Sequence, residues 1–427
     1  MILMDKKKTV LILGANGQLG RCLYDYIEND KIDLDVTYYG RQQIDLMYIE
    51  SVEDVREFLG DASYDFVVNC AAYTDTWQAE KAYEEQGNMF NTPNWKINST
   101  ALKWLSKYFN EKGTHLIHIS TDFVYQGNSP TSYCEQDALS TCIMTAYASA
   151  KADGEWYVQK IMDNYTIFRT SWLVSNHGNN FLNKVYNQLG NNEISLPYDE
   201  YACPTFATCL ARFIIDNIVN GNISKCTDEH IFNVTNCWEK PVWSKYDFAK
   251  YIFGNVGNIK AKKRGDMGNR PQYIEMNMDK TKEHFDVSAL EIPIDVCRAE
   301  YIRNLGERIR KNSPEREWEY TKDLDYLVTL VNAFDVDNRQ PCPCTRNMLN
   351  SIVYELWDRY GYYSMVTPRI DGWFKDFSGF HFNIWKNGGK REIETFHMYD
   401  SCATPEEALS YAIIDIIDLI KKDNNDE

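Results

Sequence analysis

The first part of the sequence predicts an α/β fold, in which a doubly wound parallel sheet carries helices on both faces. Continuous apolar stretches of strand length alternate there with amphipathic stretches of helix length. Strands that are apolar at every position are buried on both faces, as in a parallel sheet covered by helices. A glycine-rich segment directly after the first apolar stretch supports the same fold.

The elements follow one another in the order that such a sheet requires. Helices are predicted at 17–29, 51–61 and 98–113, where Ser51 is a candidate N-cap and Gly113 a stop signal. The sequence predicts five strands, at residues 9–15, 36–40, 65–72, 115–121 and 165–172. Beyond residue 186 the pattern is less regular, with short strands at 193–197 and 230–236 and helices at 208–221 and 243–254.

A charged stretch with a proline at 311–319 marks a candidate domain boundary. We expect one domain over residues 1–312, with a smaller lobe mainly from about 173–310, and an accessory α+β domain of unknown function over 313–427. Within the second domain, helices are predicted at 324–334, 346–361 and 404–422, and a hairpin around Asn387-Gly388-Gly389.

The composition excludes several classes of function. A formal net charge of −17 argues against broad nucleic-acid binding, because phosphates need Lys and Arg. No signal-like apolar segment opens the chain, and no apolar run reaches the roughly 18 residues of a membrane span. We therefore expect a cytoplasmic protein with reduced cysteines. Cys342 and Cys344 form a C-x-C without a second pair, so no metal site is predicted.

The glycine-rich segment after the first strand has the spacing G-x-x-G-x-x-G, formed by Gly14, Gly17 and Gly20. Glycines there let the backbone approach a pyrophosphate closely, and a helix beginning at the third glycine would point its N-terminus at the negative charge. The pattern on the first βα turn predicts a Rossmann-type dinucleotide site. The alternative is an ordinary glycine-rich loop.

A second pattern supplies candidate acid–base groups. Tyr147 and Lys151 are four residues apart and share one helical face. A lysine ammonium beside a tyrosine favours the phenolate and lowers its pKa. Ser120, Thr121 and Asp122 follow a predicted strand at its C-terminal end, where open α/β sheets bind ligands. Each pattern alone is common by chance, but their order along the chain is specific.

Together these residues resemble the extended short-chain dehydrogenases, and most closely the dTDP-4-dehydrorhamnose reductase family. The resemblance covers roughly residues 8–310. It rests on the segments LILGANGQLG, DFVVNCAAYT with Ala79-Glu80, HISTDFVY, the Tyr147/Lys151 pair, IFRTSWLV followed by GNNF, Pro204-Thr205, IFNVTN and Arg270-Pro271.

The resemblance implies roles for individual residues. Tyr147 would donate the proton, Lys151 would adjust its pKa and anchor the ribose, and Thr121 would bind the carbonyl. The implied substrate contacts are Thr74, Thr121, Asp122 and Trp172, although Trp172 is also compatible with plain core packing. The implied cofactor contacts are Gly14, Asn16, Gly17, Gln18, Leu19, Gly20, Arg41, Asp45, Leu46, Ala71, Ala72, Tyr73, Tyr147 and Lys151.

The chain departs from the family pattern at several positions. Phe123 replaces the usual tyrosine, Trp77 stands where an aspartate is common, and Glu275 replaces a basic residue near the expected nucleotide end. An insertion lies between Glu80 and Asn98. The changes leave the identity of the sugar nucleotide open.

The implied activity is NAD(P)H-dependent reduction of the C4 ketone of a nucleotide-linked 4-keto-6-deoxy sugar, in the synthesis of deoxysugar precursors such as dTDP-rhamnose. Arg41, at the end of the second strand, suits the 2′-phosphate of NADPH. A homodimer is a candidate assembly. Two alternatives remain: a sugar-nucleotide epimerase or dehydratase, and a non-catalytic nucleotide-binding subunit of the same fold.

Overall fold

The structure is a computed structural model. It describes residues 7–127, 131–137, 145–189, 193–236, 238–254, 259–265, 270–312, 362–371 and 376–386. The chain forms two compact units. The first comprises residues 1–188, 195–248 and 260–297, and the second comprises 189–194, 249–259 and 298–427.

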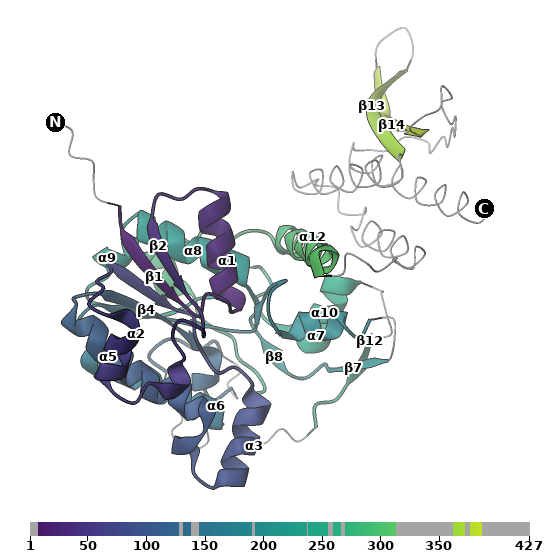
Figure 1. Cartoon of the computed structure of the whole chain (residues 1–427). Coiled ribbons are helices and arrows are strands. Elements are labelled where there is room, and N and C mark those ends of the chain that lie inside the picture. Colours follow the sequence, from purple (N-terminus) through teal and green to yellow (C-terminus); the bar gives the residue numbers. More distant parts are fainter. Residues whose placement is uncertain are drawn as a thin grey trace, which may run out of the picture. The chain divides into compact units, whose positions relative to one another are not determined.

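A six-stranded parallel sheet forms the centre of the first unit (Figure 1), which confirms the predicted doubly wound α/β fold. The strand order is β2-β1-β3-β4-β5-β10, and every neighbouring pair is parallel. The strands are β1 (Thr9–Leu13), β2 (Asp35–Tyr39), β3 (Phe66–Asn69), β4 (His115–Thr121), β5 (Tyr165–Thr170) and β10 (Ile231–Asn233).

The strand order places a topological switch point between β1 and β3. The chain leaves β1 for β2 on one side and returns to β3 on the other. Ligands of open α/β sheets bind at such a point, outside the carboxyl ends of the strands. The fold therefore directs attention to the loops after Leu13 and Asn69.

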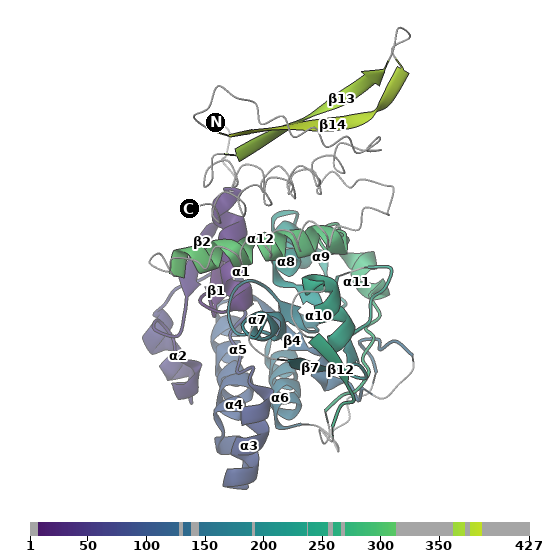
Figure 2. The same ribbon diagram turned by 90° about the vertical axis from the view of Figure 1, so that its right-hand side faces the viewer.

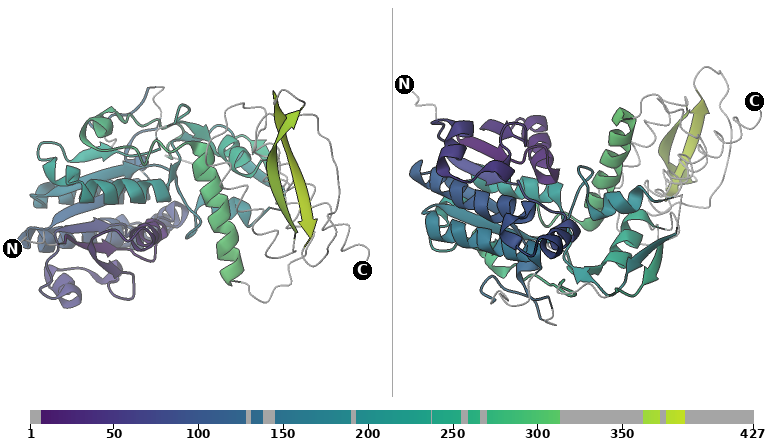
Figure 3. Two further views of the ribbon diagram at one scale, coloured as in Figure 1. Left: turned by 90° about the horizontal axis from the view of Figure 1, so that it is seen from above. Right: turned by 60° about the horizontal axis from the view of Figure 1, so that its bottom comes forward.

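Helices lie on both sides of the sheet (Figures 2 and 3). On one side α1 (Gln18–Asn29) packs against α8 (Ala207–Val219). On the other, α5 (Ala101–Glu111) packs against α2 (Val52–Leu59) and α6 (Ala146–Ile161). β10 and α8 come from residues that the sequence assigned to the smaller lobe. In the structure β10 is an edge strand of the main sheet, and α8 packs against α1. Phe232 of β10 packs among buried aromatics that include Phe168.

The helix ends follow the capping signals with one correction. Ser51 and Asp54 form a capping box at the start of α2, as the sequence predicts. By contrast, α1 begins at Gln18 with Gly17 as its N-cap, not at the third glycine. Thr145 caps α6, which places Tyr147 and Lys151 in the first turns of that helix.

Further elements lie between and after the strands of the sheet, and the last of them, residues 294–312, falls mostly in the second unit. None of the described helices is both long enough and apolar enough to cross a membrane. The remaining elements are η1 (Leu46–Tyr48), α3 (Thr76–Gln86), η2 (Met89–Asn91), α4 (Pro93–Trp95), the π-helix η3 (Lys96–Thr100), η4 (Asp122–Val124), β6 (Leu173–Val174), α7 (Phe181–Tyr186), β7 (Ile194–Pro197), β8 (Tyr201–Ala202), β9 (Thr205–Phe206), α9 (Asn222–Lys225), β11 (Trp243–Ser244), α10 (Lys245–Phe253), β12 (Ile259–Lys262), α11 (Asp279–His284) and α12 (Ile294–Asn312).

Beyond Asn312 the structure describes one antiparallel pair, β13 (Tyr362–Asp371) and β14 (Asp376–Lys386). β14 pairs with the preceding strand, with Tyr363 opposite Trp385. The hairpin turn predicted at 387–389 lies outside the described residues, as do the helices predicted at 324–334, 346–361 and 404–422 and the C-x-C at 342–344. The domain boundary near residue 312 stays a prediction.

Candidate active site

The glycine loop fits tightly against the end of β3. Gly14 has a φ of +79°, and a Cβ placed on it would lie 2.6 Å from the backbone nitrogen of Ala71. A Cβ on Gly20 would collide with the carbonyl oxygen of Gly14. A larger residue at position 14 would push the loop away from the end of β3, and one at position 20 would collide with the loop's own backbone, so both glycines are required by the fold of the loop.

A pocket of about 600 Å³ opens at the switch point between β1 and β3. Its lining includes residues from the loops after three strands and from η3. The predicted members among them are Gly14, Asn16, Gly17, Arg41, Asp45, Leu46, Ala71 and Ala72. Leu13, Gly40, Gln42, Ile44, Cys70 and Ile97 line it as well, and sequence reasoning did not identify them. A glycine cradle, a helix N-terminus and a cleft of this size suit a dinucleotide.

Six predicted cofactor residues do not line this pocket: Gln18, Leu19, Gly20, Tyr73, Tyr147 and Lys151. The Gln18 side chain donates to the Leu173 carbonyl at 3.0 Å and accepts from Asn180 at 2.6 Å, so it ties α1 to the chain after β5. Leu19 is buried. Tyr73 packs against the cluster that contains Tyr147.

The side chains of Asp45 and Arg41 differ in their contacts: Asp45 is hydrogen-bonded to the backbone, and Arg41 is exposed. The Asp45 carboxylate accepts from the backbone N–H of Met47 at 3.0 Å and thereby caps η1. Arg41 is exposed at the pocket rim. Its guanidinium is thus open to an anionic group entering the pocket.

Tyr147 lies in a largely apolar environment. Its ring centroid is 5.7 Å from that of Phe123 in an edge-to-face arrangement, and Ala79 and Tyr73 pack in the same cluster. Burial raises the pKa of Tyr147 above its usual 10, a hydrogen bond with Thr121 opposes the rise, and the charge of Asp122 adds to it. Contrary to the expectation from the Tyr147/Lys151 spacing, the pKa is raised, because burial outweighs the stabilising contacts.

Lys151 is buried and contacts β4. Its Nζ donates to the Ile119 carbonyl at 2.7 Å and lies 3.1 Å from Nε2 of His118. Burial lowers the pKa of Lys151 to about 8, and the Glu155 carboxylate partly opposes this. In this structure the Lys151 side chain therefore makes its hydrogen-bond contacts with His118 and Ile119, and not with Tyr147.

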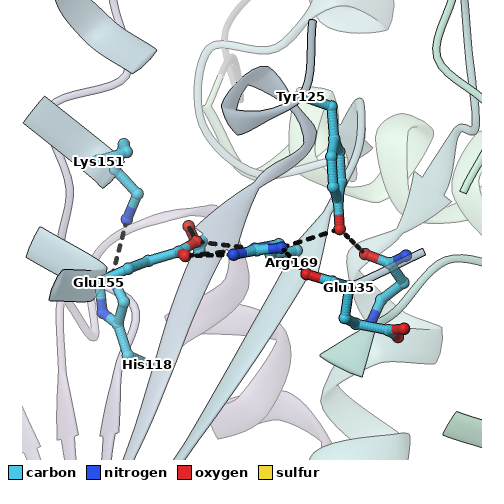
Figure 4. A network of polar contacts seen from close by, with 8 residues as sticks. His118, Tyr125, Glu135, Lys151, Glu155 and Arg169 are labelled. Carbon is cyan, nitrogen blue, oxygen red and sulfur yellow. Dashed lines mark hydrogen bonds and ion pairs between the residues drawn. The ribbon is translucent and has the colours of Figure 1, made fainter. Parts of the chain in front are cut away.

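A buried polar network continues from this lysine along α6 (Figure 4). Glu155, one turn after Lys151, pairs with the Arg169 guanidinium at 2.7 Å and accepts from Ser120. Arg169 also donates to the Tyr125 hydroxyl at 3.0 Å. Buried charges need such partners, and this pairing fixes α6 against β4 and β5.

The candidate substrate side lies around the end of β4. Asp122 is buried and accepts from Ser171 at 2.5 Å and from Thr121 at 3.1 Å. Burial raises its pKa to about 6. Thr74 is exposed. The fold brings Thr121, Asp122 and Tyr147 close to one another here, and their contact with a substrate stays a prediction.

Trp172 has a backbone conformation that is rare for a residue with a side chain. Its φ is +35°, and its ring centroid lies 6.1 Å from Phe181 and 5.5 Å from the Lys245 ammonium. Backbone strain at a residue with a side chain concentrates at functional sites.

Arg270 contacts Thr76, and its guanidinium lies 5.8 Å from the ring centroid of Phe123, the residue that departs from the family pattern.

Comparison with known proteins agrees with this geometry. The family model described as "RmlD substrate binding domain" matches residues 8–296. A dTDP-4-dehydrorhamnose reductase of Sinorhizobium fredii is 28% identical over 289 residues, which is 65% of this chain and 91% of that protein. A dTDP-4-keto-6-deoxy-D-glucose reductase of Streptomyces niveus is 27% identical over 282 residues, which is 64% of this chain and 90% of that protein.

Solved structures agree as well. A dTDP-4-dehydrorhamnose reductase of Bacillus anthracis in complex with NADP superimposes with a TM-score of 0.56 and 26% identity, covering 67% of this chain and 98% of that one. A Bordetella bronchiseptica protein with NAD+ bound has a TM-score of 0.52 at 13% identity, covering 70% of this chain and 99% of that one, which is a likeness of fold alone.

Proposed function

Because this chain belongs to the RmlD substrate binding domain family, we propose that it reduces the C4 ketone of a nucleotide-linked 4-keto-6-deoxy sugar. It is an NAD(P)H-dependent oxidoreductase, and its cofactor is NADPH or NADH. The product would be a deoxysugar nucleotide of the kind used in dTDP-rhamnose synthesis.

One observation carries the proposal: two hydroxyl groups meet beside the pocket at the switch point. Thr121 ends β4, and its hydroxyl is close enough to Tyr147 to lower the pKa of that phenol against the effect of burial. Tyr73 follows Ala71 and Ala72 of the pocket lining and packs against the Tyr147 cluster. A ketone held between the pocket and these hydroxyls would have its oxygen toward them and its carbon toward the cofactor.

The raised pKa of Tyr147 supports the direction of the proposed reaction. A reductase needs a proton donor, and burial keeps Tyr147 in its phenol form. When bound, NADPH or NADH supplies the hydride for C4. Tyr147 then gives its proton to the ketone oxygen, while Thr121 orients that oxygen. Holding both partners in one cleft supplies much of the remaining rate.

The remaining residues of the proposal divide between cofactor and sugar. We assign the pyrophosphate to the glycine loop, the ribose to Lys151, and the adenine side to Asp45 and Leu46. Arg41 favours NADPH, because an exposed guanidinium at the pocket rim can bind a 2′-phosphate bidentately. Thr74, Asp122 and Trp172 would face the sugar.

Turnover with defined substrates tests the function. The purified full-length chain is incubated with NADPH or NADH and with dTDP-, UDP- or GDP-linked 4-keto-6-deoxy sugars, and loss of reduced cofactor is followed by absorbance. Mass spectrometry should find a product with two more hydrogen atoms than the substrate. Absence of turnover with every sugar nucleotide, despite measurable cofactor binding, would favour the non-catalytic alternative.

The assembly and location belong to the same proposal. We propose a homodimer in the cytoplasm that acts on a small sugar nucleotide without a nucleic-acid or membrane partner. Size-exclusion chromatography with light scattering measures the assembly. A single monomer mass at micromolar protein concentration would contradict the dimer.

A further inference from the structure

The Gln18 side chain joins the first turn of α1 to the segment that follows β5. Its Nε2 donates to the Leu173 carbonyl at 3.0 Å. Its Oε1 accepts from Nδ2 of Asn180 at 2.6 Å and from Oγ of Ser175 at 3.2 Å. Ser175 and Asn180 are buried, and Gln18 is half-buried. Both lone pairs of the amide oxygen and one N–H of the amide are therefore engaged with this one segment.

The orientation of the Gln18 amide is fixed from both ends. A backbone carbonyl can only accept, so the NH₂ group of Gln18 faces Leu173. Oδ1 of Asn180 accepts from the backbone N–H of Asn183 and caps α7, so the Asn180 NH₂ group faces Gln18. The Gln18 oxygen must accept from it. Position 18 therefore needs a donor and an acceptor on one terminal group, and a methionine of similar length has neither.

The segment held by Gln18 begins with the strained residue Trp172. A φ of +35° is costly for a residue with a side chain, and it persists only where the surroundings hold it. The carbonyl of Trp172 accepts from the backbone N–H of Thr205 at 3.3 Å, where β6 pairs with β9. The next carbonyl, that of Leu173, accepts from Gln18. The chain that leaves the strained residue is thus anchored by Thr205 and by α1.

Gln18 also holds the neighbours of the two rings that meet in this segment. The ring centroids of Trp172 and Phe181 are 6.1 Å apart. Leu173 follows Trp172, Asn180 precedes Phe181, and both Leu173 and Asn180 are hydrogen-bonded to the Gln18 amide. Loss of this amide would therefore release the backbone on both sides of the contact between the rings.

The backbone and the side chain of Gln18 face different surroundings. Gly14, Asn16 and Gly17 of the glycine loop line the pocket, whereas Gln18 does not. α1 begins at Gln18, so its backbone N–H belongs to the first turn, whose N–H groups have no partner within the helix. A substitution of the side chain leaves this backbone in place, so a role on the sugar side can be tested apart from cofactor binding.

We propose that Gln18 is a positioning residue for the sugar side of the site, and that its amide holds Trp172 in the left-handed conformation beside Phe181. The role of Trp172 in sugar binding rests on the proposed reductase function, whereas the hold on residues 172–181 does not depend on it. Without the amide, Trp172 relaxes toward a negative φ and its ring leaves the sugar side. The glycine loop keeps its place for the cofactor.

Hydrogen exchange of the ligand-free, full-length chain tests this hold directly. Gln18→Met keeps a side chain of similar length and removes every hydrogen bond of the amide. Mass spectrometry should show exchange over residues 172–181 that is faster by about tenfold or more, because at least two hydrogen bonds are lost. Peptides from α2 are the internal reference. Unchanged exchange over 172–181 would overturn the proposal, whatever the activity assays show.

Two control variants separate this contact from others nearby. Gln188→Met is the same substitution at an exposed glutamine, whose Nε2 donates to a carbonyl of α7 at 3.1 Å. Asp25→Ala removes a different contact between α1 and the segment, in which the Asp25 carboxylate lies 2.8 Å from Nε2 of His177. Exchange at Trp172 should match that of the unchanged protein in both. Equal acceleration in either control would show that the Gln18 amide is not what holds Trp172.

The kinetic effect should fall on the sugar nucleotide alone. In Gln18→Met we expect KM for the sugar nucleotide to rise about tenfold, with kcat and KM for NADPH nearly unchanged, because the ring would contact substrate and transition state alike. Adding Gln18→Met to Trp172→Gly should raise KM no further, since the ring through which Gln18 acts is already absent. A rise in KM for NADPH, or additive effects in the double variant, would overturn the positioning role.

Failure of the reductase function would be recognised separately. If the unchanged chain binds NADPH but reduces none of the sugar nucleotides, the proposed function is wrong, and the exchange experiment still decides whether Gln18 holds residues 172–181. If turnover is present but Gln18→Met changes neither the exchange nor KM for the sugar nucleotide, the function stands and the role of Gln18 does not.

Discussion

At the scale of single residues, Tyr147 carries the proposed proton transfer. Tyr147→Phe removes one oxygen and keeps the ring that packs edge-to-face on Phe123. We expect kcat to fall by about 10²–10⁴-fold, the usual contribution of a positioned acid, with cofactor affinity nearly unchanged. Steady-state kinetics and cofactor titration by fluorescence measure the two quantities.

The control for this substitution is Tyr157→Phe on the same helix, at a position outside the proposed site. It should retain full turnover. Wild-type turnover in Tyr147→Phe would show that Tyr147 is not the proton donor, and it would favour the hypothesis of a non-catalytic nucleotide-binding subunit.

Arg41 is the residue on which the NADPH preference depends. Arg41→Ala should lower kcat/KM for NADPH by about tenfold or more, the worth of one charged hydrogen-bond partner, and leave NADH nearly unaffected. The ratio of the two kcat/KM values is the measurement. Arg56→Ala, on α2 outside the pocket lining, is the control. An unchanged ratio in Arg41→Ala would show that the guanidinium only contacts solvent.

Asp122 makes stability depend on pH. Burial raises its pKa from 3.8 to about 6, so the unfolded carboxyl loses its proton at lower pH than the folded one. Its contribution to stability is present at low pH and is lost as pH rises from about 4 to 6, by at most about 3 kcal/mol.

The test is the urea midpoint of Asp122→Asn against that of the unchanged chain across this pH range. An amide does not titrate, so the variant should gain stability relative to the unchanged chain as pH rises through about 6. A difference that stays constant over the range would mean that Asp122 has an ordinary pKa.

At the scale of elements, α6 is held against the sheet by two buried polar contacts one turn apart. Lys151 meets His118 of β4, and Glu155 meets Ser120 of β4 and Arg169 of β5. Lys151 and Glu155 are four residues apart and lie on one face of the helix, and His118 and Ser120 are two residues apart and lie on one face of the strand. The two faces therefore meet at both positions. The helix that carries Tyr147 is thereby fixed in rotation.

The Glu155–Arg169 pair should dominate the stability of this contact. Glu155→Gln leaves a buried guanidinium without its counter-charge, and we expect a loss of about 3–5 kcal/mol in the free energy of unfolding. The double variant Glu155→Gln/Arg169→Met should recover part of the loss. Urea unfolding, followed by tryptophan fluorescence, measures each.

The exposed pair of Arg56 and Glu111 gives the comparison. Arg56→Ala should cost at most about 1 kcal/mol, because solvent screens an exposed ion pair. A loss in Glu155→Gln no larger than this would show that α6 is held by its apolar contacts alone.

At the scale of the whole molecule, the sequence beyond the charged stretch at 311–319 carries none of the catalytic motifs. We predict that a chain ending at Asn312 folds and keeps its reductase activity within tenfold of the full-length chain. Circular dichroism during thermal unfolding and the turnover assay test both parts. Non-cooperative unfolding, or a larger loss of activity, would show that residues 313–427 complete the core or the site.

The sequence alone determined the order of strands and helices, the glycine loop after β1 and the place of Thr121 at the carboxyl end of a strand. These follow from local rules: apolar runs mark strands buried on both faces, a tight βα turn needs glycine, and the carboxyl ends of parallel strands lie at one edge. The tight packing of Gly14 against Ala71 accords with the same rules.

Only the tertiary structure decided what surrounds the proposed catalytic groups. The spacing of Tyr147 and Lys151 suggested a lowered tyrosine pKa, but burial raises it. Asn69 and His118 are 49 positions apart, and strand register alone makes them neighbours. Desolvation and buried hydrogen-bond partners depend on packing between distant segments, and no local pattern in a single sequence encodes them.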